Sequence, residues 1–128
     1  MKIVILIVMF FCHIADDYYL QGCLANMKQK SWWQKQTPNK LYKYDYIMAL
    51  IEHAFSWSFM IMLPILIYMM YNNELHIELY AFMLIINLIG HSIIDNCKAN
   101  DLCINLIIDQ CLHFIQIIFT WLLFILYI

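Results

Sequence analysis

Four long apolar runs make up most of the chain, and short polar segments separate them. The runs extend over about residues 3–24, 46–71, 75–95 and 102–128. A helix needs about 20 mainly apolar residues to cross a bilayer, so each run is long enough for one span. None of the runs shows the two-residue alternation that is typical of a membrane β-barrel strand. The sequence therefore predicts an all-α integral membrane protein, a four-helix bundle that forms a single domain over residues 1–128.

The composition favours the same class of protein. Only 12% of the residues are charged and 65% are hydrophobic, whereas about a quarter of the residues in a soluble domain are charged. The net charge is -2 and the chain contains no arginine, so no nucleic-acid partner is expected. The expected surroundings are a lipid bilayer, and association into an oligomer is left open.

The lysines are distributed unevenly between the connections. Residues 26–45, between the first two runs, hold five of the seven lysines. The second connection has none, and the third has only Lys98. Because lysine-rich connections stay in the cytoplasm, this distribution predicts cytoplasmic first and third connections and both termini outside.

The first run also has the outline of a cleaved signal peptide. Lys2 precedes an apolar core, and the small residue Ala15 offers a cleavage position. The bulky His13 would then occupy a position that requires a small residue, so we favour a retained membrane span.

The five cysteines form no CxxC pair and are expected to be reduced, packing as small hydrophobic residues; they are Cys12, Cys23, Cys97, Cys103 and Cys111.

Each apolar run contributes a histidine, and in three runs an aspartate lies one helical turn from it. The pairs are His13 with Asp17, His91 with Asp95, and Asp109 with His113, while His53 lies in the second run. On antiparallel helices with a rise of 1.5 Å per residue, most of these side chains fall about 7 to 18 Å from one membrane surface; they are His13, Asp17, His53, His91, Asp109 and His113. An aspartate at such a depth costs about 2.5 to 3.5 kcal/mol if it faces lipid. The pairs are therefore expected to face inward and to meet in one layer.

Histidines and carboxylates around a bundle axis are typical of a metal site. A divalent metal is predicted, with zinc as the best match and iron or manganese as alternatives. The remaining polar groups are expected to orient the ligands or to line the rim of the site. The predicted ligands are His13, Asp17, His91, Asp95, Asp109 and His113, and the supporting or rim residues are Gln21, His53 and Gln110.

The alternative to a metal site is a purely structural role for these polar residues. A hydrogen-bonded His–Asp network can serve only to hold membrane helices together. Asp16 is next to Asp17, which turns its side chain about 100° away on a regular helix, so it is expected outside the cluster or paired with a lysine.

The ordered polar residues resemble one known family. The segments "HIADDYYLQ", "NMKQK", "HSIIDNCK" and "DQCLH", with His53, follow the pattern H-x3-D-x3-Q, K, H, H-x3-D-x2-K and D-Q-x2-H. This pattern is similar to that of the domain-of-unknown-function 3307 family, small polytopic membrane proteins of bacteria and their phages. The family usually has Phe where Tyr18 follows Asp17. The matching residues are His13, Asp17, Gln21, Lys28, His53, His91, Asp95, Lys98, Asp109, Gln110 and His113.

The resemblance implies a multi-pass protein of the bacterial inner membrane with a shared polar site, and it implies no particular reaction. From the residues, the first hypothesis is a metal-dependent hydrolase of a lipid or lipid-linked phosphate. In this hypothesis Asp17 or Asp95 acts as the base and Lys98 meets an anionic headgroup. The alternative is a non-catalytic phage or mobile-element membrane protein, a pore former or exclusion factor, whose His–Asp network is structural. Passage of protons or metal ions along the polar layer is a third hypothesis.

Overall fold

The computed structural model describes residues 2–127, and this part of the chain is helical without a strand. The predicted all-α class is confirmed. Four of the helices are long and apolar enough to cross a membrane. In chain order the elements are α1 (Lys2–Ala15), a π-helical turn η1 (Asp16–Leu20), α2 (Leu24–Met27), α3 (Lys30–Gln36), a 3-10 turn η2 (Lys40–Tyr42), α4 (Asp45–Tyr71), α5 (Ile77–Ala99) and α6 (Leu106–Tyr127).

The helix ends differ from the predicted spans by a few residues. The first long helix, α1 with η1, ends at Leu20 rather than near residue 24. The chain turns at Gly22, whose φ of +51° lies in the left-handed region that glycine adopts without strain. At the third span α5 continues past residue 95 to Ala99, and α6 begins at Leu106 rather than near residue 102. Ile128, the predicted end of the fourth span, lies outside the described residues.

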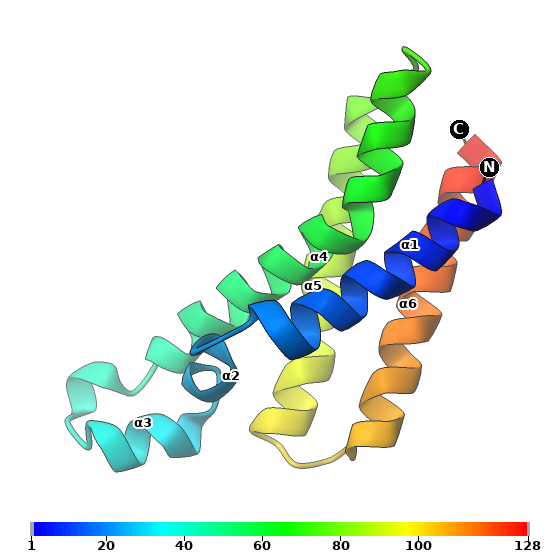
Figure 1. Cartoon of the computed structure of the whole chain (residues 1–128). Coiled ribbons are helices and arrows are strands. Elements are labelled where there is room, and N and C mark those ends of the chain that lie inside the picture. Colours follow the sequence, from blue (N-terminus) through cyan, green and yellow to red (C-terminus); the bar gives the residue numbers. More distant parts are fainter. Residues whose placement is uncertain (1, 128) are drawn as a thin grey trace.

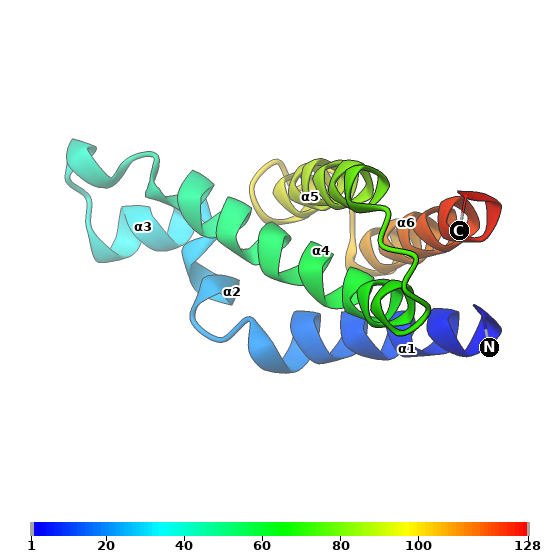
Figure 2. The ribbon, with the colours of Figure 1, turned by 90° about the horizontal axis from the view of Figure 1, so that it is seen from above.

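The four long helices form a closed bundle. Helix α1 packs against α4 and α6, and α5 also packs against both α4 and α6. Figure 2 shows this arrangement from above, and Figure 1 shows the start of α1 and the end of α6 close together. The α4–α5 connection lies at the upper end of Figure 1, while α2, α3 and the α5–α6 connection lie at the lower end. The bundle therefore has an antiparallel up-and-down topology, with the long first connection beside the lower end.

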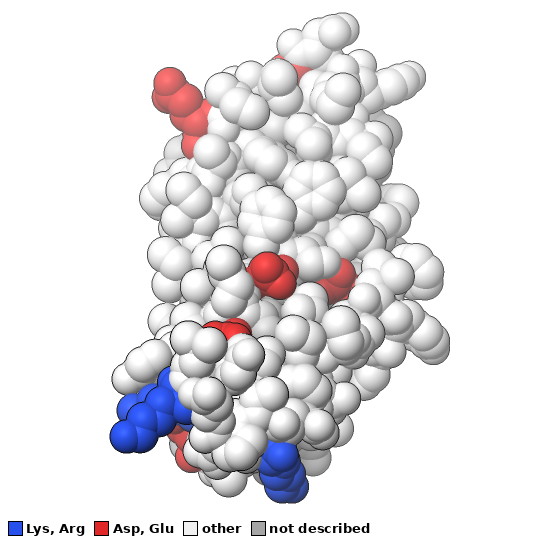
Figure 3. All heavy atoms as spheres, turned by 90° about the vertical axis from the view of Figure 1, so that its left-hand side faces the viewer, with Lys and Arg blue, Asp and Glu red and all other residues white. Residues whose placement is uncertain are grey.

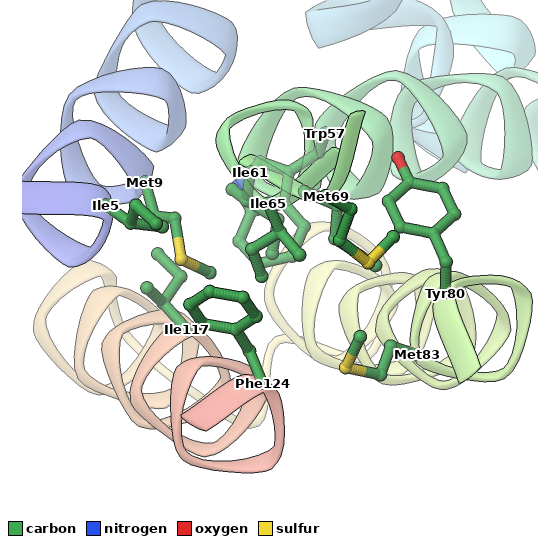
Figure 4. Close-up of a cluster of buried hydrophobic side chains, with 11 residues drawn as sticks. Ile5, Met9, Trp57, Ile61, Ile65, Met69, Tyr80, Met83, Ile117 and Phe124 are labelled. Atoms are coloured by element: carbon green, nitrogen blue, oxygen red, sulfur yellow. The ribbon is translucent and has the colours of Figure 1, made fainter. Parts of the chain in front are cut away.

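One half of the bundle interior is apolar. On α4 the fully buried residues Trp57, Ile61, Ile65 and Met69 recur every four positions, so they form one stripe along the helix. Side chains from the other three helices close over this stripe, as Figure 4 shows. Pro64 lies inside α4, and because proline has no N–H the helix bends, as Figure 1 shows.

The outer faces of the long helices are also apolar. Phe11 is 69% exposed and Ile107 is 74% exposed, and similar side chains cover α4 and α5. A helix that is apolar on all sides belongs in a core or a membrane, so we assign these faces to lipid. On the face drawn in Figure 3 the lysines gather at the lower end, and much of the remaining surface is uncharged. This distribution agrees with a bundle that crosses a membrane with its lysine-rich connection at one surface.

The topology can be tested by cysteine labelling. All five native cysteines are free, so they can be replaced by alanine before single cysteines are introduced. Gln36→Cys on α3 should react with an impermeant maleimide from the cytoplasmic side, and Glu74→Cys in the α4–α5 connection should react from the outside. Both positions are exposed. The opposite pattern would overturn the orientation, and labelling of both from one side would overturn the four-span topology.

Candidate metal centre

Each long helix contributes one histidine to a buried cluster below the apolar core. His13, His53, His91 and His113 all have an exposed fraction of 0%. The ring centroids of His53 and His91 are 5.0 Å apart, those of His91 and His113 are 4.3 Å apart, and those of His13 and His113 are 5.7 Å apart. The structure therefore brings together the four histidines that the sequence places on four different spans.

The Nε2 atom of His53 lies at the centre of the ligand atoms. It is 3.1 Å from His91 Nε2, 3.3 Å from Asp17 Oδ1 and 3.3 Å from Asp95 Oδ2. Zinc bonds of about 2.0 to 2.1 Å in a tetrahedral site place neighbouring ligand atoms about 3.3 to 3.4 Å apart. The three distances from His53 are close to the three edges that meet at one corner of such a tetrahedron. The arrangement could therefore hold a metal ion.

Two sets of three ligand atoms lie within 4.8 Å of one another, and they share His91. The first set contains Asp17 and His53, and the second contains Asp95 and His113. All five residues are buried. Asp17, His91, Asp95 and His113 were predicted as ligands, and the structure places each of them in one of these sets.

Of the four clustered histidines, His113 is the one whose ring has the fewest hydrogen-bond partners. Its Nε2 lies 3.4 Å from Asp95 Oδ1 and 3.5 Å from Asp109 Oδ1. Neither ring nitrogen makes a hydrogen bond within residues 2–127. Buried polar atoms are nearly always paired with protein, water or an ion, so this ring is suited to bind a water molecule or a metal.

If the imidazoles are neutral, the charges of the described residues in this layer do not balance. Four buried aspartates, Asp16, Asp17, Asp95 and Asp109, lie there. Two lysines pair with them: Lys28 Nζ is 2.5 Å from Asp95 Oδ2, and Lys98 Nζ is 2.6 Å from Asp109 Oδ2. As carboxylates the four groups would leave two formal negative charges, which one divalent cation would balance. Protonated imidazoles would balance the same charge, so the ligand geometry rather than the charge favours a metal.

His13 differs from its predicted role as a ligand. Trp57 Nε1 donates a hydrogen bond to His13 Nδ1 at 2.7 Å. Because an indole nitrogen can only donate, Nδ1 must be the acceptor and Nε2 carries the proton. That Nε2–H donates to Gln110 Oε1 at 3.0 Å. Both ring nitrogens are occupied, so His13 supports the site and does not coordinate a metal in this arrangement.

Gln110 connects His13 to two carboxylates through hydrogen bonds. With its oxygen accepting from His13, its amide group donates to Asp109 Oδ2 at 3.0 Å and to Asp17 Oδ2 at 3.3 Å. This supporting role is the one predicted for Gln110. Asp109, predicted as a ligand, instead contacts Lys98, Gln110 and His113 and lies outside both ligand sets. The Gln21 side chain donates to the backbone oxygen of Asp17 and so stays beside the site.

His53 was predicted at the rim, and the structure places it at the centre. His53 is central because its helix, α4, packs against both α1 and α5. Sequence reasoning also missed Trp57, which stacks on His91 with ring centroids 4.2 Å apart and donates to His13. Trp57 lies four residues after His53, the spacing that puts two side chains on one helix face. That spacing was the signal that could have identified it.

Asp16 was expected outside the cluster, and this expectation is wrong. Its exposed fraction is 1%, Ser56 donates to its Oδ1 at 2.7 Å, and its Oδ2 lies 4.0 Å from His53 Nδ1. The π-helical turn that begins at Asp16 widens the helix and lets both Asp16 and Asp17 face the interior. At that separation Asp16 Oδ2 and His53 Nδ1 are not hydrogen-bonded to each other, and neither atom makes a hydrogen bond in the described chain. A carboxylate behind the second nitrogen of a histidine is the usual way to orient a metal ligand.

A cavity of about 240 Å³ leads to the site from the lower end of the bundle. Lys28 and Lys98 stand on its walls, together with the ligand candidates Asp17 and Asp95. The Lys28 side chain is 13% exposed and that of Lys98 is 36% exposed. The cavity therefore joins two cationic groups to the buried carboxylates, which gives an anion a path to the site.

Comparison of the chain with family models, curated proteins and solved structures found no match. The resemblance to the domain-of-unknown-function 3307 family thus stays a prediction that rests on the ordered polar residues.

The contribution of Asp16 can be measured as metal affinity. Asp16→Asn keeps the shape of the side chain but removes the negative charge behind His53. It should weaken zinc binding about 10- to 100-fold, the usual effect of losing such a support. The measurement is competition against a fluorescent zinc chelator in detergent. Asp101→Asn, at an aspartate whose side chain is 48% exposed, should leave the affinity unchanged; equal affinities for the two variants would refute the role of Asp16.

Proposed function

We propose that this protein is an intramembrane metal-dependent hydrolase that cleaves the phosphate ester of a lipid or of a lipid-linked phosphate. The observation that carries the proposal is the pair of short separations from His53 Nε2, 3.1 Å to His91 Nε2 and 3.3 Å to Asp17 Oδ1. Zinc is the best match to two imidazoles and carboxylate oxygens, with iron or manganese as alternatives.

Asp17, His53 and His91 are the proposed ligands. Catalytic zinc sites commonly use three protein ligands and leave the fourth position to water. Asp95 Oδ2 lies close to these ligands, 3.3 Å from His53 Nε2. Lys28 holds the same oxygen at 2.5 Å and so competes with a metal for it. Asp95 is therefore better placed to act on the water molecule than to serve as a ligand.

The proposed substrate follows from the access path. Lys28 and Lys98 line the cavity near the lower end of the bundle, where an anionic group would meet them before it reaches the metal ligands. Both are paired with carboxylates, and each can exchange that partner for a phosphate oxygen. Outside the bundle the helices expose apolar side chains, so a substrate with a lipid chain can approach within the membrane. Lys98 keeps the role predicted for it from the sequence.

The proposed reaction is hydrolysis with balanced proton transfer. A bound divalent metal would lower the pKa of a water molecule and polarise the phosphoryl oxygen. Asp95 accepts one proton from the water molecule while the water oxygen forms a bond to phosphorus. The bond between phosphorus and the lipid oxygen then breaks, and the leaving oxygen takes up the proton from Asp95. His113, 3.4 Å from Asp95 Oδ1, is placed to stabilise the protonated carboxyl group.

We also propose that the chain is a member of the domain-of-unknown-function 3307 family and lies in the bacterial inner membrane with both termini outside. The ordered polar residues and the lysine-rich first connection support this proposal.

A purely structural His–Asp network is the second candidate function. Its support is that several of the polar groups are already paired, with Lys28 on Asp95, Lys98 on Asp109 and Gln110 on His13. In that case the protein would be non-catalytic, as the phage or mobile-element hypothesis has it. Metal content separates the two candidates directly.

The metal test compares histidines inside and outside the cluster. Protein purified in detergent without chelators should carry about one divalent metal per chain, measured by plasma mass spectrometry. His91→Ala and His53→Asn should each lose it, whereas His76→Ala, at an exposed position in the α4–α5 connection, should keep it. Circular dichroism should show a helical fold for all three. A folded wild type that binds no added zinc would leave the structural network as the function.

The activity test separates binding from chemistry. Phosphatidic acid and an isoprenyl monophosphate serve as lipid substrates, and phosphate release is measured with zinc-loaded protein. Asp95→Asn should retain the metal but lose phosphate release by at least about 100-fold, the lower range for a general base. Lys98→Met should mainly raise KM, because Lys98 contacts the headgroup. Metal-loaded wild type without activity on either lipid would refute the proposed substrate, and loss of metal in Asp95→Asn would show that Asp95 is a ligand.

A further inference from the structure

A second cavity, separate from the metal site, lies in the first connection. It measures about 610 Å³ and is formed by α3, η2 and the start of α4. Its lining includes Lys30, Lys40 and Lys43 together with Trp33, Tyr42 and Tyr44. None of the metal-site residues lines it, so its ligand is independent of the proposed hydrolase.

Two of the lysines around this cavity lie over tyrosine rings, and two have no carboxylate partner among the described residues. Lys30 Nζ lies 5.0 Å from the centre of the Tyr46 ring, and Lys43 Nζ lies 5.1 Å from the centre of the Tyr44 ring. Lysine ion pairs within residues 2–127 involve Lys28, Lys30 and Lys98. Lys40 and Lys43 therefore have no carboxylate partner in that range, and the lining contains no acidic residue among the described positions.

The walls of the cavity are fixed to the rest of the protein. Trp33 stacks against Tyr42 with an interplanar angle of 11°, and its Nε1 donates to Met27 O at 2.6 Å. The backbone nitrogen of Lys30 donates to Asn100 Oδ1 at 2.7 Å, which ties α3 to the end of α5. These bonds make the connection a folded part of the protein rather than a loose linker.

We propose that this cavity binds the phosphate headgroup of an anionic phospholipid. Lys40 and Lys43, which have no carboxylate partner among the described residues, complement a phosphate, whereas Lys30 is already 3.9 Å from Asp101. Juxtamembrane lysines are attracted to anionic lipid. The occupant is a lipid rather than a free phosphate because apolar side chains border the cations: Leu41 is 74% exposed and Tyr44 is 62% exposed. Tryptophan and tyrosine rings at the membrane surface contact the region where headgroup and acyl chain meet.

The experiment compares two double variants that remove the same charge. Lys40→Met/Lys43→Met alters the cavity, while Lys2→Met/Lys35→Met alters two lysines outside its lining. Full-length protein in detergent is titrated with phosphatidylglycerol or with phosphatidylcholine of the same acyl chains, and bound lipid is counted by native mass spectrometry. The titrations are made with and without chelator, since binding should not depend on a metal.

The wild type should bind one phosphatidylglycerol and prefer it to phosphatidylcholine. Loss of Lys40 and Lys43 should weaken that binding about 10- to 30-fold, as expected for two lysines near a charged surface. The control variant should bind as the wild type does. Equal binding of the two lipids, or equal losses in both variants, would overturn the proposal. Glycerol phosphate that binds as tightly as phosphatidylglycerol would show a free-phosphate site and would also overturn it.

Discussion

The need to neutralise buried carboxylates determines how the lower half of this bundle is built. Asp16, Asp17, Asp95 and Asp109 are at most 8% exposed in a protein whose outer faces are apolar. Each such group would cost about 2.5 to 3.5 kcal/mol if it faced hydrocarbon alone. All four therefore meet imidazoles, lysines or hydroxyl groups from other helices. The upper half contains mainly apolar side chains, and there the helices are joined by packing and by contacts such as Asn87 with Thr120 at 2.8 Å.

The same constraint gives the site its order. Trp57 fixes the tautomer of His13, His13 fixes Gln110, and Gln110 then directs its amide group toward Asp17 and Asp109. Each step follows from the donors and acceptors that these side chains possess. A rigid surround of this kind holds His53, His91 and Asp17 at separations that suit a metal. It also leaves His113 facing Asp95 with unused hydrogen-bonding capacity.

The sequence was sufficient for the class of fold and for the existence of the cluster. Long apolar runs predict spans, and polar residues at matched depth on antiparallel helices predict a shared layer. The sequence was not sufficient to predict which role each residue has within that layer. His13 and His53 differ in role because Trp57 reaches one ring and not the other, which depends on how the helices cross. Asp16 joins the cluster because of a π-helical turn. A prediction that assumes a regular α-helix does not include such a turn.

The most direct test of a metal centre is X-ray absorption spectroscopy on zinc-loaded protein in detergent. We predict two imidazole nitrogens and one or two oxygens at about 2.0 to 2.2 Å from the zinc, with the imidazole multiple-scattering signal of His53 and His91. A sulfur shell at about 2.3 Å would show that cysteines bind the metal instead. A spectrum with oxygen neighbours and no imidazole signal would place the zinc outside the His–Asp cluster and contradict the account.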